Sequence, residues 1–173
     1  NNVVVAQLWL DFKFPILINL PHMAVNELIR IKKEPVEMIV ANNHATFIYE
    51  DGRWLRSQLN ETKWPDINGF FKNRVDSKAQ VVPAGFFDAL RDIAPFVDAI
   101  GRAHIMPGKV STSTDIDLAT SVEVEGLDGG GIYNVTQLLL LEGIADKLNF
   151  TAHPAPAVFY GENLRGSIIG MNM

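Results

Sequence analysis

Hydrophobic and polar positions follow one pattern that occurs three times along the chain: a strand, an amphipathic helix, and three more strands. The copy at 131–173 is the most regular. It predicts a strand at 131–133, a helix at 135–148 capped by Asn134, and strands at 147–152, 157–160 and 164–173. The apolar face of this helix is expected to carry Leu138, Leu141, Ile144, Ala145 and Leu148.

Two further copies precede it. The copy at 16–59 predicts a strand at 16–20, a helix at 24–33 stopped by Pro35, and strands at 36–40, 45–49 and 53–59. The copy at 79–125 predicts a strand at 80–82, a helix at 84–97 shortened or kinked by Pro95, and strands at 102–106, 109–114 and 119–125. Residues 1–11 read as a strand that ends a unit beginning before residue 1.

Two neighbouring copies can close a domain, with two helices packed beneath antiparallel sheets. The sequence therefore predicts an α+β fold of repeated β-α-β-β-β units. Residues 79–173 form a complete domain, and residues 1–78, ending in a polar connection, form the second half of another. The chain begins on a strand-like run without an initiator Met, so we expect a fragment of a longer protein.

Composition narrows the class of protein. Of the 173 residues, 47% are hydrophobic and 20% charged, which is typical of a folded globular protein. The net charge of −5 predicts that the surface repels nucleic acid except at a local positive patch. Cysteine is absent, which excludes disulfides and thiol chemistry and suits a reducing cytosol. No apolar run approaches the ~20 residues of a membrane helix, so a cytoplasmic protein without membrane contact is expected.

Candidate chemistry is sparse. The histidines lie in different predicted elements, without metal-ligand spacing, and are expected at the surface or in turns: His22, His44, His104 and His153. Asp115 and Asp117 lack the Gly and Glu of a calcium loop and are typical of a hairpin turn. We therefore expect no catalytic residue, no metal site and no cofactor.

Three stretches carry a resemblance to a known family. Residues 49–59 followed by Trp64-Pro65-Asp66-Ile67 give a hairpin, a strand ending in Ser-x-Leu, and aromatic-Pro-Asp. Gly131-Ile132-Tyr133-Asn134-Val135 leads into a leucine-rich helix, and the chain ends in Ile168-Ile169-Gly170-Met171-Asn172-Met173. In order and spacing, the whole chain resembles the back half of the bacterial DNA polymerase sliding clamps, the β clamps of replication, which have three domains of two such units each.

The resemblance implies a hydrophobic pocket for short partner peptides between the middle and C-terminal domains. By position its lining corresponds to Val3, Val4, Pro65, Phe70, Ile169, Met171 and Met173. Met and aromatic side chains can repack against different apolar peptides, which suits a receptor with several partners. Asn172 replaces the usual Pro of the clamp ending. The usual Thr-Asp-Gly-His-Arg is cut off or replaced, since only Asn1-Asn2-Val3-Val4 stand there. These departures indicate a divergent version, from a phage or a mobile element.

The resemblance also implies a ring around double-stranded DNA, with helix cations facing the hole. The candidates are Arg30, Lys32, Lys33, Arg91 and Lys147. These cations are few for a DNA-binding surface. Cations at the C-terminal end of a helix are also favoured by the helix dipole, without any role in DNA binding.

The leading hypothesis is a non-catalytic processivity factor of DNA replication. It would encircle DNA non-specifically, form a homo-oligomeric ring in the full-length protein, and bind DNA polymerase and other partners through short peptides. The alternative is a clamp-fold protein- or peptide-binding module that does not encircle DNA. A more distant alternative is a metal-dependent enzyme using Asp115, Asp117 and a histidine.

Overall fold

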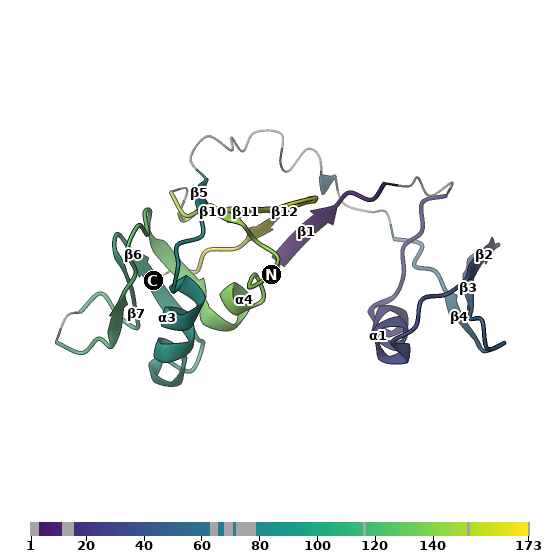
Figure 1. The fold of residues 1–173 in the computed structure, drawn as a ribbon, viewed down its shortest axis with the longest axis horizontal. Coiled ribbons are helices and arrows are strands. Elements are labelled where there is room, and N and C mark those ends of the chain that lie inside the picture. The colour runs from purple at the N-terminus through teal and green to yellow at the C-terminus, as the bar shows by residue number, and fades with distance from the viewer. Residues whose placement is uncertain are drawn as a thin grey trace. The chain divides into compact units, whose positions relative to one another are not determined.

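A computed structural model describes residues 4–11, 16–62, 66–67, 71, 79–115, 117–151 and 153–172 (Figure 1). The chain divides into two compact units. The smaller unit is Phe12–Asp66, and the larger unit is Asn1–Asp11 together with Ile67–Met173. No helix within the described ranges is long and apolar enough to cross a membrane.

The smaller unit packs one helix on one antiparallel sheet. Its elements are α1 (His22–Ile31), β2 (Glu37–Ala41), β3 (His44–Ile48) and β4 (Trp54–Gln58), in the sheet order β2-β3-β4. Ala45, Phe47 and Tyr49 are buried on the inner face of the sheet, and Leu28 and Ile31 of α1 pack against them. Burial alternates along each strand, as expected where one face of a sheet is covered.

Two predictions for the smaller unit are wrong. Helix α1 ends at Ile31, before Pro35 can act, because Lys32 adopts a left-handed conformation (φ 52°) and its N–H bonds to the Ile29 carbonyl at 3.2 Å. Residues 16–20 form no strand, since no described strand pairs with them. Instead the Asn19 carbonyl accepts a bond from the Asn60 N–H at 2.8 Å.

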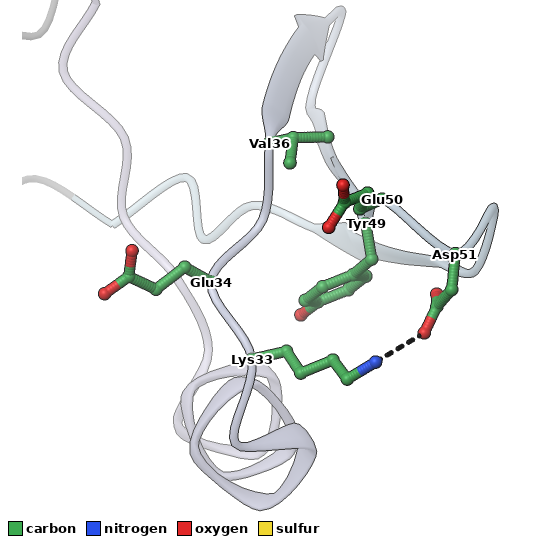
Figure 2. A pocket seen from close by; sticks show the side chains of 6 residues that line it. All are labelled: Lys33, Glu34, Val36, Tyr49, Glu50 and Asp51. Carbon is green, nitrogen blue, oxygen red and sulfur yellow. Dashed lines mark hydrogen bonds and ion pairs between the residues drawn. The ribbon is translucent and has the colours of Figure 1, made fainter.

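The β3–β4 turn carries the main ion-pair cluster of this unit. Asp51 accepts hydrogen bonds from Arg53 and from Lys33, and these bonds hold the pKa of Asp51 well below its usual value. Figure 2 shows Tyr49 beside the Lys33–Asp51 pair. These residues line a hollow of about 550 Å³. The Tyr49 hydroxyl is buried and has no hydrogen-bond partner among the described atoms.

The larger unit contains two β-α-β-β-β repeats that exchange their first strands. One sheet has the order β8-β7-β6-β9 and the other the order β1-β12-β11-β10-β5. The first repeat comprises β5 (Gln80–Val81), α3 (Phe86–Ile93), β6 (Arg102–Met106), β7 (Lys109–Ser111) and β8 (Ser121–Glu123). The second comprises β9 (Gly131–Asn134), α4 (Val135–Leu139), β10 (Lys147–Asn149), β11 (Ala157–Gly161) and β12 (Leu164–Ile168).

The exchange ties the two repeats together. Strand β5 of the first repeat pairs with β10 of the second, and β9 of the second pairs with β6 of the first, all antiparallel. The Gln80 side chain strengthens the link, because its amide donates to the Asp128 carbonyl at 2.8 Å and its oxygen accepts from the Asp128 N–H at 2.9 Å. Each four-strand set β8-β7-β6-β9 and β12-β11-β10-β5 therefore depends on both repeats.

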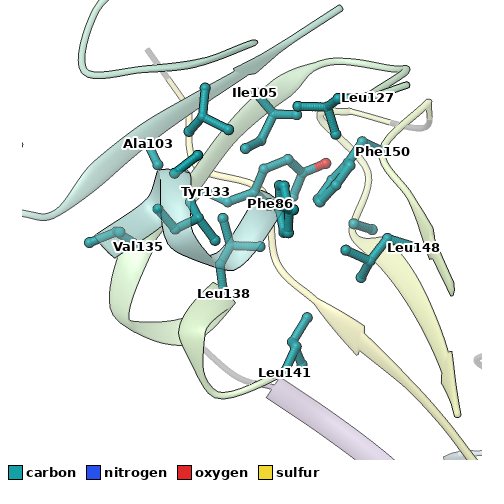
Figure 3. Close-up of a cluster of buried hydrophobic side chains, with 14 of the residues drawn as sticks. Phe86, Ala103, Ile105, Leu127, Tyr133, Val135, Leu138, Leu141, Leu148 and Phe150 are labelled. Atoms are coloured by element: carbon teal, nitrogen blue, oxygen red, sulfur yellow. The ribbon is translucent and has the colours of Figure 1, made fainter. Parts of the chain in front are cut away.

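One hydrophobic core lies between the sheets and helices of the larger unit (Figure 3). Phe86, Leu90 and Ile93 of α3 are fully buried, as is Leu138 of α4. The Phe150 ring lies 5.9 Å from the Phe86 ring centroid and 5.1 Å from that of Tyr133. Since the core draws on both repeats, the two repeats fold around a shared interior.

The helices of this unit are shorter than predicted. Helix α3 ends at Ile93 and continues as a 3₁₀ turn, η2 (Ala94–Phe96), as the position of Pro95 predicted. Helix α4 caps as predicted, with the Gln137 N–H bonded to the Asn134 side chain at 3.1 Å, but it ends at Leu139 rather than at 148.

The early end of α4 corrects the predicted helix face. The Leu141 N–H bonds three residues back to the Leu138 carbonyl, and Gly143 takes a left-handed φ of 74°. Leu141, Ala145 and Leu148 are still buried, from irregular backbone and β10, whereas Ile144 is 48% exposed. The helical periodicity of the sequence correctly predicted that the leucines are buried, but it wrongly predicted that Ile144 is buried.

The Tyr133 hydroxyl is a polar group inside this core. The residue is fully buried, burial raises the pKa of its hydroxyl, and no described atom bonds to that oxygen. We predict that Tyr133→Phe leaves the free energy of unfolding unchanged or raises it by up to about 1 kcal/mol, because an unpaired buried polar group is costly. Urea unfolding measures this change.

Leu138→Ala is the control for the same core and should lower stability by about 2–5 kcal/mol. A loss above about 1 kcal/mol in Tyr133→Phe would show that the hydroxyl does have a partner, such as a buried water.

Candidate functional site

The first strand of the chain lies along the last. Strand β1 (Val4–Leu8) pairs antiparallel with β12, in a register that runs from Val4 opposite Ile168 to Leu8 opposite Leu164. The backbone of Val4 therefore lies beside the end of β12, where Ile169 follows. The structure thus brings together two predicted pocket residues that are 165 positions apart (169 − 4).

Side chains fix the other end of this ladder. The Arg165 Nε donates to the Gln7 side chain at 2.9 Å. The guanidinium carbon of Arg165 lies 5.2 Å from the Trp9 ring centroid and 4.6 Å from that of the buried Phe71. Cation–π contacts of this kind stabilise by about 0.5–2 kcal/mol depending on desolvation. They hold β1 on the edge of the five-stranded sheet.

The C-terminal segment is held on the opposite sheet. After β12 ends at Ile168, the Met171 N–H donates to the Ile132 carbonyl of β9 at 2.7 Å. The Met171 carbonyl in turn accepts a bond from His153 Nε2 at 3.0 Å. The side chains of Ile169 and Met171 are partly exposed. Both peptide polar groups of Met171 are therefore paired while its side chain remains accessible.

The described part of the predicted pocket is thus an edge, which we call the docking edge: the backbone of Val4 together with Ile169 and Met171. Val3, Pro65, Phe70 and Met173 lie outside the described residues. The docking edge presents apolar side chains beside backbone that both sheets immobilise, an arrangement that suits an apolar peptide.

The predicted DNA-facing cations mostly have acidic partners. In the smaller unit, Arg30 pairs with Glu27 at 2.7 Å and Lys33 with Asp51 at 3.0 Å. In the larger unit, Arg91 pairs with Glu142 at 2.6 Å and with Asp88 at 2.5 Å. Lys32 and Lys147 are exposed, and neither forms an ion pair with the residues described here.

The surface of α3 is therefore a poor surface for phosphate. Arg91 is its only cation, and two carboxylates bind it while Asp92 is also exposed on the same helix. Exposed ion pairs contribute little to stability, but they offset the charge that a phosphate would meet. A DNA contact here would have to break or share these pairs.

No metal centre is found in the described ranges, where no group of three or more His, Asp or Glu residues converges. Asp115 and Asp117 lie in the connection between β7 and β8, and the Asp117 N–H bonds to the Asp115 side chain at 3.1 Å. The predicted turn fits this geometry.

The histidines differ in their burial and in their contacts. His22 is exposed, as predicted, at the start of α1. His104 in β6 is partly buried, and this burial lowers its pKa. His153 lies in a turn, as predicted, and its ring is also bonded to Met171 beside the docking edge. A lone histidine between small residues gives no signal for such a role, so the sequence did not reveal it.

Comparison with solved structures identifies the fold. The chain matches the DNA polymerase sliding clamp of Pseudomonas aeruginosa, solved with a ligand, with a TM-score of 0.75 and 18% identity over 98% of this chain and 53% of the clamp. It matches the beta subunit from the DNA polymerase of Streptococcus pyogenes with a TM-score of 0.74 and 17% identity over 98% of this chain and 52% of that one.

A third match is the Helicobacter pylori beta clamp bound to a DNA ligase peptide, with a TM-score of 0.68 and 15% identity over 89% of this chain and 45% of that one. No protein-family model and no curated protein matches the sequence. The class is therefore an α+β protein of repeated β-α-β-β-β units. More particularly, the fold is that of the bacterial DNA polymerase III beta sliding clamps, and the chain spans about half the length of these structures.

Proposed function

We propose that this chain is part of a sliding clamp, a non-catalytic processivity factor that docks short apolar peptides of a DNA polymerase and other partners. The observation that carries the proposal is the β1–β12 ladder, which sets Val4 beside the end of β12 within a clamp fold. Ile169 and Met171 then complete an apolar edge whose backbone is already hydrogen-bonded. A pre-ordered edge lowers the entropy cost of binding a peptide.

The bound molecules named for two neighbours support peptide docking. The Helicobacter pylori clamp was solved with a DNA ligase peptide, and a Pseudomonas aeruginosa clamp with griselimycin. The thioether of Met171 is flexible and polarisable, so it can adapt to different apolar side chains. Several partners can therefore use one docking edge.

The domain arrangement is part of the same proposal: residues 79–173 form a complete domain and residues 1–78 the second half of another. In the larger unit, β9 covers the edge of β6. No described strand pairs with the matching edge of β2 in the smaller unit, and Val25 and Ile29 of α1 are exposed. A further β-α-β-β-β repeat would fill both places. In a longer chain, homo-oligomers of such domains would form the ring around double-stranded DNA.

The pairing of Arg91 favours a second candidate, a clamp-fold protein- or peptide-binding module that does not encircle DNA. Arg30 and Lys33 are also paired, and the whole chain carries a net charge of −5. Non-specific DNA binding depends on uncompensated cations. Peptide docking is common to both candidates, whereas DNA affinity separates them.

Peptide docking is tested by the fluorescence anisotropy of a labelled Gln-Leu-x-Leu-Phe peptide titrated with the chain. We expect saturable binding that weakens about tenfold in Ile169→Ala and is lost on removal of residues 171–173, because both changes remove apolar contact area.

Leu118→Ala is the matched control, since Leu118 is an exposed apolar residue (80%) on the β7–β8 connection and is not part of the docking edge. It should bind like the parent chain. Absence of binding to the parent chain, or equal losses in Leu118→Ala and Ile169→Ala, would contradict the proposed docking site.

DNA affinity is tested by releasing Arg91. In the double variant Asp88→Asn with Glu142→Gln, both acidic partners become neutral. If α3 faces DNA, the affinity for duplex DNA at low salt should rise about two- to tenfold, and the salt dependence should steepen. Electrophoretic mobility shift at several salt concentrations measures both quantities.

The control for charge alone is Asp115→Asn with Asp117→Asn, which makes the same change of net charge in the β7–β8 connection. Equal effects of the two double variants would mean that only net charge matters. That result would contradict a DNA-facing α3 and favour the binding module.

A further inference from the structure

The ring of His153 occupies a fitted space beside the docking edge. A Cβ atom added to Gly131 would lie 2.6 Å from the His153 ring, and one added to Gly170 would lie 2.9 Å from it. Both distances are shorter than carbon atoms tolerate, so the ring requires glycine at both positions. Gly131 also has a positive φ of 138°, a conformation that favours glycine. The ring thus lies between the start of β9 and the C-terminal segment.

Two further contacts orient the ring. It meets the Tyr133 ring edge to face, with centroids 5.9 Å apart and an interplanar angle of 73°. Its Nε2 lies 3.0 Å from the Met171 carbonyl, within hydrogen-bond distance for the tautomer that carries the proton on Nε2. Packing and hydrogen bonding therefore fix the ring in one position and direct its N–H at Met171.

This bond completes the pairing of Met171. The N–H of Met171 already bonds to Ile132 of β9, so His153 supplies the partner for its carbonyl. Within the described residues 169–172, these two hydrogen bonds tie the segment to the fold after β12 has ended. Without the ring, the Met171 carbonyl would lose its partner, and the space between Gly131 and Gly170 would be empty.

We propose that His153 is a positioning residue for the docking edge: its imidazole fixes Met171, and thereby the apolar side chains that a partner peptide contacts. This inference rests on the proposed function for the identity of the ligand, but not for the order of the segment. His153 contacts the peptide indirectly, through Met171. The entropy cost of ordering this segment is met during folding, so peptide binding does not have to offset it.

The test compares His153→Ala and His153→Gln in the whole chain. The amide hydrogen exchange of Met171 should accelerate about five- to tenfold in His153→Ala, because the segment loses one hydrogen bond and its packing. Affinity for the labelled Gln-Leu-x-Leu-Phe peptide should fall by a similar factor. Gln carries an N–H donor of comparable reach, so His153→Gln should recover part of both losses.

A pair of glycine variants tests the same inference from the other side. Gly170→Ala should displace the ring and behave like His153→Ala, since the new Cβ would lie 2.9 Å from the imidazole. Gly130→Ala is the matched control, because its Cβ would lie 3.5 Å from the Ile105 carbonyl, an ordinary contact. The exchange of the Ala145 amide, which bonds to the Leu141 carbonyl, reports whether the fold is intact.

The outcomes are separable. Unchanged exchange at Met171 in His153→Ala would overturn the inference whether or not the peptide binds. Faster exchange with unchanged peptide affinity would show that docking does not depend on the order of the segment, and would also overturn it. Failure of the parent chain to bind the peptide would instead overturn the proposed function. In that case, faster exchange in His153→Ala with recovery in His153→Gln would still support the role of His153 in ordering Met171.

Discussion

The exchange of first strands between two repeats is the constraint on which the larger unit depends. Because β5 pairs with β10 and β9 with β6, neither repeat can complete its sheet without the other. The shared core around Phe86, Tyr133 and Phe150 follows from this arrangement, since the residues that fill it come from both repeats. The exchange also places β9 where the C-terminal segment can bond to it.

The docking edge follows from the same constraint. One edge of the five-stranded sheet is β1, which pairs with β12, and one edge of the four-stranded sheet is β9. The segment after Ile168 leaves the first sheet and bonds through Met171 to the second. A short chain end therefore obtains fixed geometry without secondary structure of its own. Ordered backbone with partly exposed apolar side chains suits peptide recognition. The glycines on either side of the His153 ring leave room for it.

The sequence predicted the repeat, the α+β class and most strands because these depend on local patterns. The strand at Arg102–Met106 and the Asn134 cap were predicted correctly, since alternation and capping are short-range signals. The length of α4 was not predicted correctly. Gly143 takes a left-handed conformation and the chain then enters β10, and both override the leucine periodicity. Residues 16–20 have a strand-like composition, yet a strand needs a neighbouring edge, and composition does not report one.

The site was predicted less completely than the fold. The position of Ile169 and Met171 near Val4 came from resemblance to the clamps, and the β1–β12 register gives it a physical basis. The ion pairs of Arg91 were visible in the sequence only as nearby acids, because its bond to Glu142 joins residues 51 positions apart. The role of His153 depends on two glycines that are distant in sequence, at 131 and 170, so no local pattern could reveal it.

The proposed docking site for apolar peptides lies where β1, the end of β12 and the C-terminal segment meet. The most direct test is to map amide chemical shifts of the labelled chain by NMR during titration with the Gln-Leu-x-Leu-Phe peptide. We predict that the largest changes fall on Val4, Ile169 and Met171, with little change along β8. Changes concentrated on β8 or on the smaller unit's sheet, or no changes at saturating peptide, would contradict the claim.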